Sequence, residues 1–150
     1  MACVSVFCHD RHYLLGINLN SLHSMSLNFA FCSSLSSIDN LGNCFADLEH
    51  LTSLTLNFTL CSKLQSIHGL AASISSLHAL TSLNLSFNSC KALPSRSNID
   101  ELGKSVVNLK AMTSAKLDFE DCSRLTSVDE STGFASVSYT HLTLPTILLV

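Results

Sequence analysis

Short stretches of the chain alternate apolar and polar residues with a period of two. The clearest, SLTLN at residues 53–57, has leucine at positions 54 and 56 and polar residues between them. This pattern predicts a β-strand with one buried face. Related stretches occur four times along the chain, within residues 22–35, 51–64, 80–93 and 112–125. We therefore expect four strands that each bury one face.

Between these stretches the apolar spacing becomes that of a helix. Three sets of four residues fall at i, i+4, i+7 and i+10, which lines one helical face. The sets are Leu41, Phe45, Leu48 and Leu51; Leu70, Ile74, Leu77 and Leu80; and Leu102, Val106, Leu109 and Met112. Asp39 and Asp100 stand just before two of the sets, where a carboxylate can cap free backbone N–H groups.

Strand and helix together form a unit that recurs. Cys32, Cys61 and Cys90 are 29 residues apart, and Cys122 follows after 32. The three extra residues fall at Pro94 and the polar stretch after it, where they lengthen a loop and leave both periodic halves in phase. One strand and one helix cannot close a core alone, but stacked copies cover each other's apolar edges.

The string LTSLNLSFNSC at residues 80–90 resembles the leucine-rich-repeat pattern L-x-x-L-x-L-x-x-N-x-L, with Cys90 in the last apolar slot. The repeat length and the helical half are most similar to the ribonuclease-inhibitor-like and cysteine-containing subclasses. The resemblance implies an α/β solenoid, a curved right-handed β/α horseshoe fragment with a parallel inner sheet and outer helices. The asparagine slot departs from the pattern in the other copies, which carry Ala30, Thr59 and Glu120. We therefore do not expect a buried asparagine ladder.

The repeats divide the chain into two parts. Residues 1–130 hold about four copies and a partial one at the N-terminal end, and we expect additional repeats beyond both ends. Residues 131–150 lose the repeat phase. Within them VSYTHLTLPT at 137–146 resembles the translated end of a sequencing-library adapter, so we interpret this tail as artefactual or disordered. The alternative is a short β-rich segment with a turn at Pro145.

Composition and charge narrow the classes of partner. Charged residues make up 13% of the chain and the formal net charge is −3, with no run of Lys or Arg. This balance argues against nucleic acid as a partner. No segment approaches the ~20 apolar residues of a membrane span, and the N-terminal stretch lacks the apolar core of a secretory signal. We therefore expect a cytoplasmic protein that does not bind membranes.

The cysteine column allows three readings: core packing, disulfides between stacked copies, or a metal site. We favour core packing, because each cysteine occupies an apolar slot where a free thiol acts as a small hydrophobe. A second possible metal site, a zinc cluster of Cys3, Cys8, His9 and His12, fits no paired-cysteine spacing. Phenylalanine recurs in phase as well, which predicts a packing spine rather than a ligand-contact stripe: Phe29, Phe58, Phe87 and Phe119.

No motif of catalysis or phosphate binding is present in the sequence, neither a G-x-S-x-G elbow nor a glycine-rich loop. We therefore predict no enzymatic activity, no cofactor and no metal. Asn57-Phe58-Thr59 and Asn84-Leu85-Ser86 are formal glycosylation sequons, which arise by chance in a chain rich in Ser and Thr. The predicted strand orientation buries Leu83 and exposes Thr81. It therefore predicts that Leu83→Asp unfolds the chain, whereas Thr81→Ala barely affects its stability.

The outward strand positions are the best functional candidates, because solenoid curvature gathers them on one concave sheet face. The predicted partner-binding residues are Ser26, Asn28, Thr55, Asn57, Asn84, Ser86, Lys116 and Asp118. The resemblance implies a non-catalytic interaction module that binds a protein or peptide through this face. Two alternatives stay open. One is an extracellular receptor segment that recognises peptide or glycan, and the other is the repeat region of a larger ubiquitin-ligase adaptor or enzyme.

Overall fold

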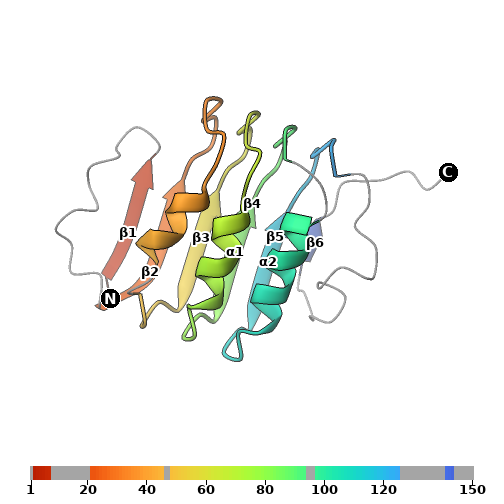
Figure 1. The fold of residues 1–150 in the computed structure, drawn as a ribbon. Helices are drawn as coiled ribbons and strands as arrows, with labels where there is room; N and C mark the ends of the chain where they lie inside the picture. Colours follow the sequence, from red (N-terminus) through yellow and green to blue (C-terminus); the bar gives the residue numbers. More distant parts are fainter. Residues whose placement is uncertain (1, 8–20, 46–47, 94–96, 126–140, 144–150) are drawn as a thin grey trace.

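The computed structural model describes residues 2–7, 21–45, 48–93, 97–125 and 141–143, which form an α/β structure around a parallel sheet (Figure 1). The sheet has six strands that follow one another in chain order. They are β1 (Ala2–Phe7), β2 (Leu22–Asn28), β3 (Ser53–Asn57), β4 (Ser82–Ser86), β5 (Ser114–Asp118) and β6 (His141–Thr143). The four predicted strands correspond to β2–β5, and the predicted α/β class with a parallel sheet is confirmed.

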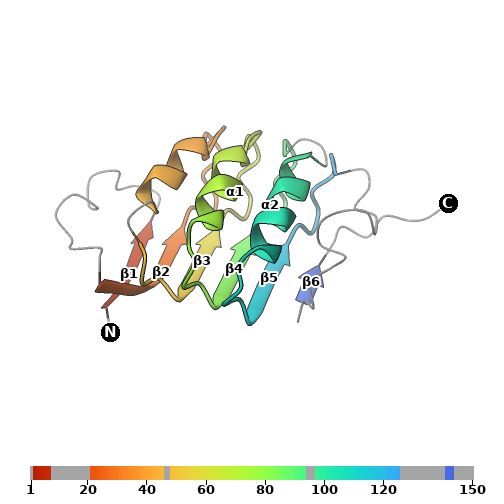
Figure 2. The same ribbon diagram turned by 60° about the horizontal axis from the view of Figure 1, so that its bottom comes forward.

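The helical segments of the described residues cover one face of the sheet and leave the other face open (Figures 1 and 2). They are the 3₁₀ helix η2 (Asp39–Cys44), α1 (His68–Ser75) and α2 (Ser97–Val107). Helix α1 lies between the other two and contacts both. We call the uncovered side of the sheet the open face.

All three helical segments end before the last positions of the apolar pattern. The pattern extends to Leu80, but α1 ends at Ser75, and Leu77 and Leu80 lie buried beyond its end. Serine hydroxyls in the last turn of α1 donate to backbone carbonyls, which competes with continuation of the helix. The first segment is only a 3₁₀ helix because its sequence, DNLGNC, consists largely of poor helix formers.

Strands β2–β5 pair in register, so each residue lies beside its equivalent in the next copy. Met25, Leu54, Leu83 and Ala115 form one such column, and Leu27, Leu56, Leu85 and Leu117 form another. All eight side chains are buried beneath the helices. The polar residues between them, such as Ser53 and Thr55, are partly exposed. The predicted strand orientation is therefore confirmed.

The predicted phenylalanine spine is present at the carboxyl ends of the strands. Rings from successive copies stack with centroids 5.2 Å apart and interplanar angles of 3°, 11° and 7°. Phe58, Phe87 and Phe119 are fully buried, and Phe29 packs partly buried against the same core. The column therefore packs the interior and does not present a stripe of rings to a ligand.

Three members of the cysteine column, Cys61, Cys90 and Cys122, are free and buried, as core packing predicts. Each thiol donates a hydrogen bond of 3.1 Å to the phenylalanine carbonyl of the preceding copy. Burial raises the pKa of Cys90 to about 12 and that of Cys122 to about 11, so these thiols stay protonated. Cys32 is disulfide-bonded, so core packing as a free thiol is wrong at that position.

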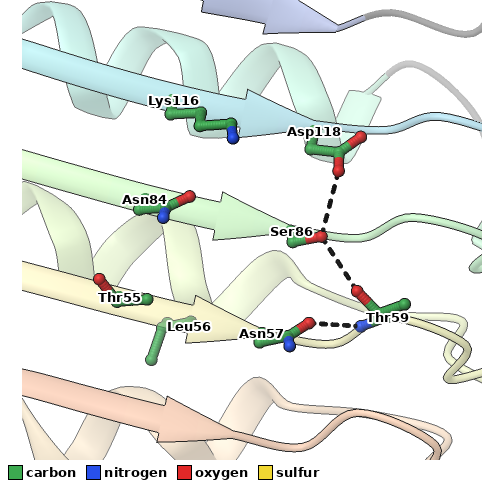
Figure 3. Close-up of a pocket in the computed structure, with 8 residues that line it drawn as sticks. All are labelled: Thr55, Leu56, Asn57, Thr59, Asn84, Ser86, Lys116 and Asp118. Carbon is green, nitrogen blue, oxygen red and sulfur yellow. Dashed lines mark hydrogen bonds between the residues drawn. The ribbon is translucent and has the colours of Figure 1, made fainter.

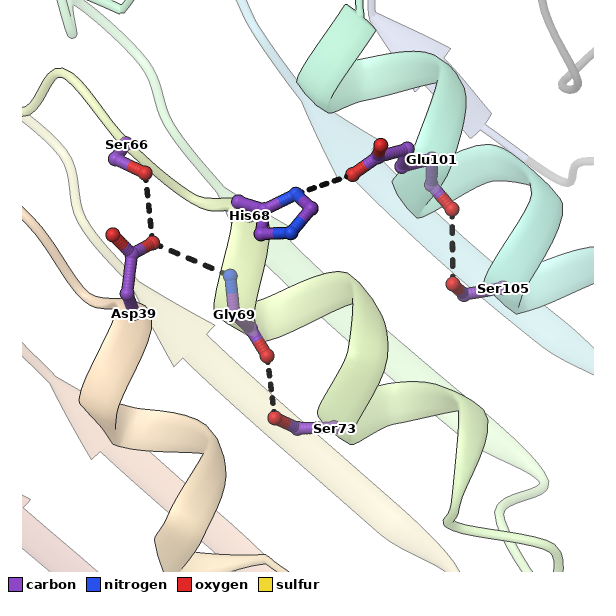
Figure 4. A network of polar contacts seen from close by, with 7 residues as sticks. All are labelled: Asp39, Ser66, His68, Gly69, Ser73, Glu101 and Ser105. Atoms are coloured by element: carbon purple, nitrogen blue, oxygen red, sulfur yellow. Dashed lines mark hydrogen bonds and ion pairs between the residues drawn. The ribbon is translucent and has the colours of Figure 1, made fainter.

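Asp39 caps a different helix from the one predicted. It is the first residue of η2, yet its carboxylate accepts hydrogen bonds from Ser66 Oγ (2.7 Å) and from the backbone N–H of Gly69 (3.3 Å) in the next copy (Figure 4). Stacking brings successive helix starts side by side, so free N–H groups are reached from the neighbour. Asp100 lies inside the first turn of α2, and its predicted place just before the helix is wrong.

Several predictions fall on residues outside the described part. These are the zinc ligands Cys8, His9 and His12, and most of the tail. Within the tail, β6 pairs with β5 in parallel (Lys116↔His141). The asparagine slot gives no buried ladder, because Asn88 lies near the surface and its amide donates to Glu120 Oε2 (3.1 Å).

Candidate binding surface on the open face

Three rows of polar side chains cross strands β2–β5 on the open face. Register pairing sets the rows, since equivalent residues of neighbouring strands lie side by side. The serine row is Ser24, Ser53, Ser82 and Ser114. The middle row is Ser26, Thr55, Asn84 and Lys116, and the carboxyl row is Asn28, Asn57, Ser86 and Asp118. The eight predicted partner-binding residues are thus two adjacent rows.

A hollow of about 200 Å³ opens among the last two rows (Figure 3). Its lining is Thr55, Leu56, Asn57, Thr59, Asn84, Ser86, Lys116 and Asp118. The structure therefore brings six of the eight predicted residues together around one space, whereas Ser26 and Asn28 lie outside it. The Leu56 side chain is buried on the helical side, so its main chain is what borders the hollow.

The carboxyl row is tied into the turns that follow the strands. Asn28, Asn57 and Asp118 each accept a hydrogen bond of 3.0 Å through Oδ1 from the backbone N–H two residues ahead. Such contacts are Asx turns, which fix the chain direction after a strand. Ser86 and Thr59 share a further hydrogen bond of 3.1 Å, and Ser86 Oγ donates to Asp118 Oδ2 at 3.3 Å (Figure 3). These side chains support the shape of the surface.

The side chains of the middle row form fewer hydrogen bonds than those of the carboxyl row. Within the described part of the chain, the side chains of Thr55, Asn84 and Lys116 make no hydrogen bond or ion pair. Figure 3 shows the three as neighbours across β3, β4 and β5. The row presents a hydroxyl, an amide and an ammonium group in succession, at the spacing of about 4.8 Å that separates paired strands.

Lys116 and Asp118 are the charged members of the three rows, one cation and one anion on the same strand. The remaining positions are Ser, Thr and Asn. A nearly neutral surface of donors and acceptors suits recognition by hydrogen bonding more than attraction of a polyanion. Among the described residues, no three His, Cys, Asp or Glu side chains lie close enough to hold a metal ion.

Threonines just before the strands have a structural role that sequence reasoning missed. The hydroxyls of Thr52, Thr81 and Thr113 each donate 2.9 Å hydrogen bonds to the carbonyl of the equivalent residue one copy earlier. Their recurrence in phase with the cysteines was the available sign of a ladder. Thr59 was also missed as a lining residue, since it was assigned to the asparagine slot.

None of the helices in the described part combines the length and the apolar character that crossing a membrane requires. Comparisons with protein families, curated proteins and solved structures found no match for this chain.

Proposed function

We propose that the chain is a piece of a leucine-rich-repeat solenoid and serves as a non-catalytic interaction module that binds a protein or peptide on the open face. In a solenoid of this kind the open face is the concave one. The in-register parallel strands, with helices on one side only, support the repeat architecture.

The observation that carries the binding role is the difference between the two rows around the hollow. Side chains of the carboxyl row satisfy one another and the turns, whereas Thr55, Asn84 and Lys116 keep their donors and acceptors. The hollow of about 200 Å³ lies below the roughly 300–1,000 Å³ of sites for drug-sized molecules. A side chain or short peptide segment is therefore a better fit than a cofactor.

One alternative has an observation in its favour. The disulfide at Cys32 is typical of oxidising compartments, which favours an extracellular receptor segment over the expected cytoplasmic module. In that case the ligand of the open face would be a peptide or glycan outside the cell. The interaction module and the extracellular receptor segment would both recognise a peptide, so one peptide-binding experiment tests this common property.

The experiment selects a displayed library of random peptides with free C-termini against the chain, and then measures the affinity of selected clones for variants. Asn84→Arg places a bulky side chain in the hollow, and we expect affinity to fall at least tenfold, about 1.4 kcal/mol. Ala72→Arg is the matched control, because it makes the same charge change at an exposed position of α1 on the covered side. An equal loss in both variants, or no selected clones, would contradict the proposal.

A further inference from the structure

We infer that the hollow on the open face is specific for a single carboxylate of a peptide ligand, held by the ammonium group of Lys116 and the amide of Asn84. This inference rests on the proposed peptide-binding function and names the chemistry of its ligand. It divides the predicted residues into ligand contacts in the middle row and supporting residues in the carboxyl row.

Lys116 is the cation that the fold leaves uncommitted beside the hollow. Its side chain is exposed on β5, and it takes part in neither of the two ion pairs of the described residues. Those pairs join His68 to Glu101 on the helical side and Lys91 to Asp121 in the turns. The Lys116 ammonium group therefore offers its charge to a ligand on the open face.

Asp118, two residues further along β5, uses both carboxylate oxygens in hydrogen bonds within the protein. Its Oδ1 accepts from the backbone N–H of Glu120 at 3.0 Å, and its Oδ2 accepts from Ser86 Oγ at 3.3 Å (Figure 3). Both carboxylate oxygens are thus directed to the turn and to the neighbouring strand. The ammonium group of Lys116 is therefore the charged group of the hollow that has no hydrogen-bond or ion-pair partner among the described residues.

Asn84 supplies the second contact. It pairs in register with Lys116 across β4 and β5, and both side chains line the same hollow. Its amide can donate to one carboxylate oxygen while the ammonium group of Lys116 donates to the other. Hydrogen bonds in which one partner is charged are stronger than neutral ones, so this arrangement favours an anion over a neutral amide.

The number of charges selects a carboxylate over a phosphate. Phosphate recognition in proteins relies on clusters of Arg and Lys, whereas Lys116 is the one cation in the three rows. Asp118 on the same strand would repel a dianion more strongly than a singly charged group. The carboxylate can come from an Asp or Glu side chain or from the C-terminus of the peptide.

The test repeats the peptide selection with Lys116→Glu and with Lys104→Glu. The control residue is an exposed lysine of α2, on the covered side, and its substitution makes the same change in net charge. We expect wild-type clones to carry a required carboxylate and to lose at least tenfold in affinity for Lys116→Glu, with Lys104→Glu unchanged. Clones selected on Lys116→Glu should require Lys or Arg instead.

Synthetic peptides separate the two sources of the carboxylate. Amidation of the C-terminus abolishes binding if the terminal group is recognised, and Asp→Asn or Glu→Gln exchange abolishes it if a side chain is recognised. Clones that bind wild type and Lys116→Glu equally, or that tolerate removal of every carboxylate, overturn the inference and leave the proposed function standing. The absence of any clone whose binding depends on the open face overturns both.

Discussion

One residue in each copy, just after the strand, adopts a left-handed backbone conformation. Phe31, Leu60, Ser89 and Asp121 have φ values of 64°, 62°, 58° and 55°. This region costs an L-residue roughly 1–2 kcal/mol and is more readily occupied by Gly, Asn or Asp. Phe31 and Leu60 also expose 73% and 39% of their surface, so neither repays the strain by burial.

Replacement of Leu60 by Asn should therefore stabilise the chain by about 0.5–1 kcal/mol, because Asn tolerates the left-handed region. The measurement is the free energy of unfolding in denaturant. Val107→Asn is the matched control, since Val107 exposes 40% of its surface but lacks a positive φ. An equal gain in unfolding free energy for the control would assign the effect to removal of an exposed apolar side chain. A lower unfolding free energy for Leu60→Asn would mean that packing of the leucine side chain stabilises the fold.

The alternation of residues was sufficient to predict the buried and open sides of each strand, but not the use of the polar side chains. Asn57 and Asn84 read alike from the sequence, as polar residues directly beside a leucine of the same strand. In the structure Asn57 closes a turn, while the Asn84 side chain makes no hydrogen bond within the described part of the chain. The difference depends on where each lies relative to the strand end, which the period of two does not encode.

Contacts between successive elements join η2 to α1 and α1 to α2 at their N-terminal ends (Figure 4). The Asp39 carboxylate accepts from Ser66 and Gly69, and His68 Nδ1 lies 2.6 Å from Glu101 Oε2. Gly69 is required for the close approach, because a Cβ there would overlap the backbone of Asp39. Local sequence predicted a cap within one helix, and stacking places it between neighbours.

Acid should weaken this link through Asp39. The hydroxyl of Ser66, more than that of Ser37, holds the pKa of the Asp39 carboxyl below its ordinary value of 3.8. A carboxyl group with a lowered folded-state pKa stabilises the fold above its unfolded-state pKa, and this contribution disappears as pH falls through the folded-state value. Because Asp39 is exposed, screening by solvent limits the effect to less than about 1 kcal/mol.

Unfolding free energies of the wild type and Asp39→Asn, measured from neutral pH to below pH 3.8, check this expectation. The wild type should be more stable by a constant amount at neutral pH, and the difference should shrink below 3.8. Ser66→Ala should reduce the same pH-dependent difference, since it removes the main hydroxyl donor. A difference that keeps its size in acid would show that the Asp39 charge does not stabilise the link.

At the scale of the whole molecule, the buried apolar residues of the described part form one core that runs from Leu22 to Leu125 through all four copies. The phenylalanine stack, the cysteine thiols and the threonine hydroxyls each link one copy to the next. Stability in such a stack depends on the interfaces between neighbouring copies. The effect of a core substitution on stability should therefore depend on the position of the substituted copy in the stack.

Met25 and Leu83 provide the test, since they occupy the same register column, in β2 and β4, and each exposes 1% of its surface. Leu83→Asp buries a charge in the middle of the stack and leaves fragments too small to close a core, so amide hydrogen exchange should become fast in β2 through β5. Met25→Asp should remove protection from β2 and β3 and preserve it in β4 and β5. Identical exchange patterns for the two variants would mean that the molecule unfolds as a single unit, with stability shared evenly among its copies.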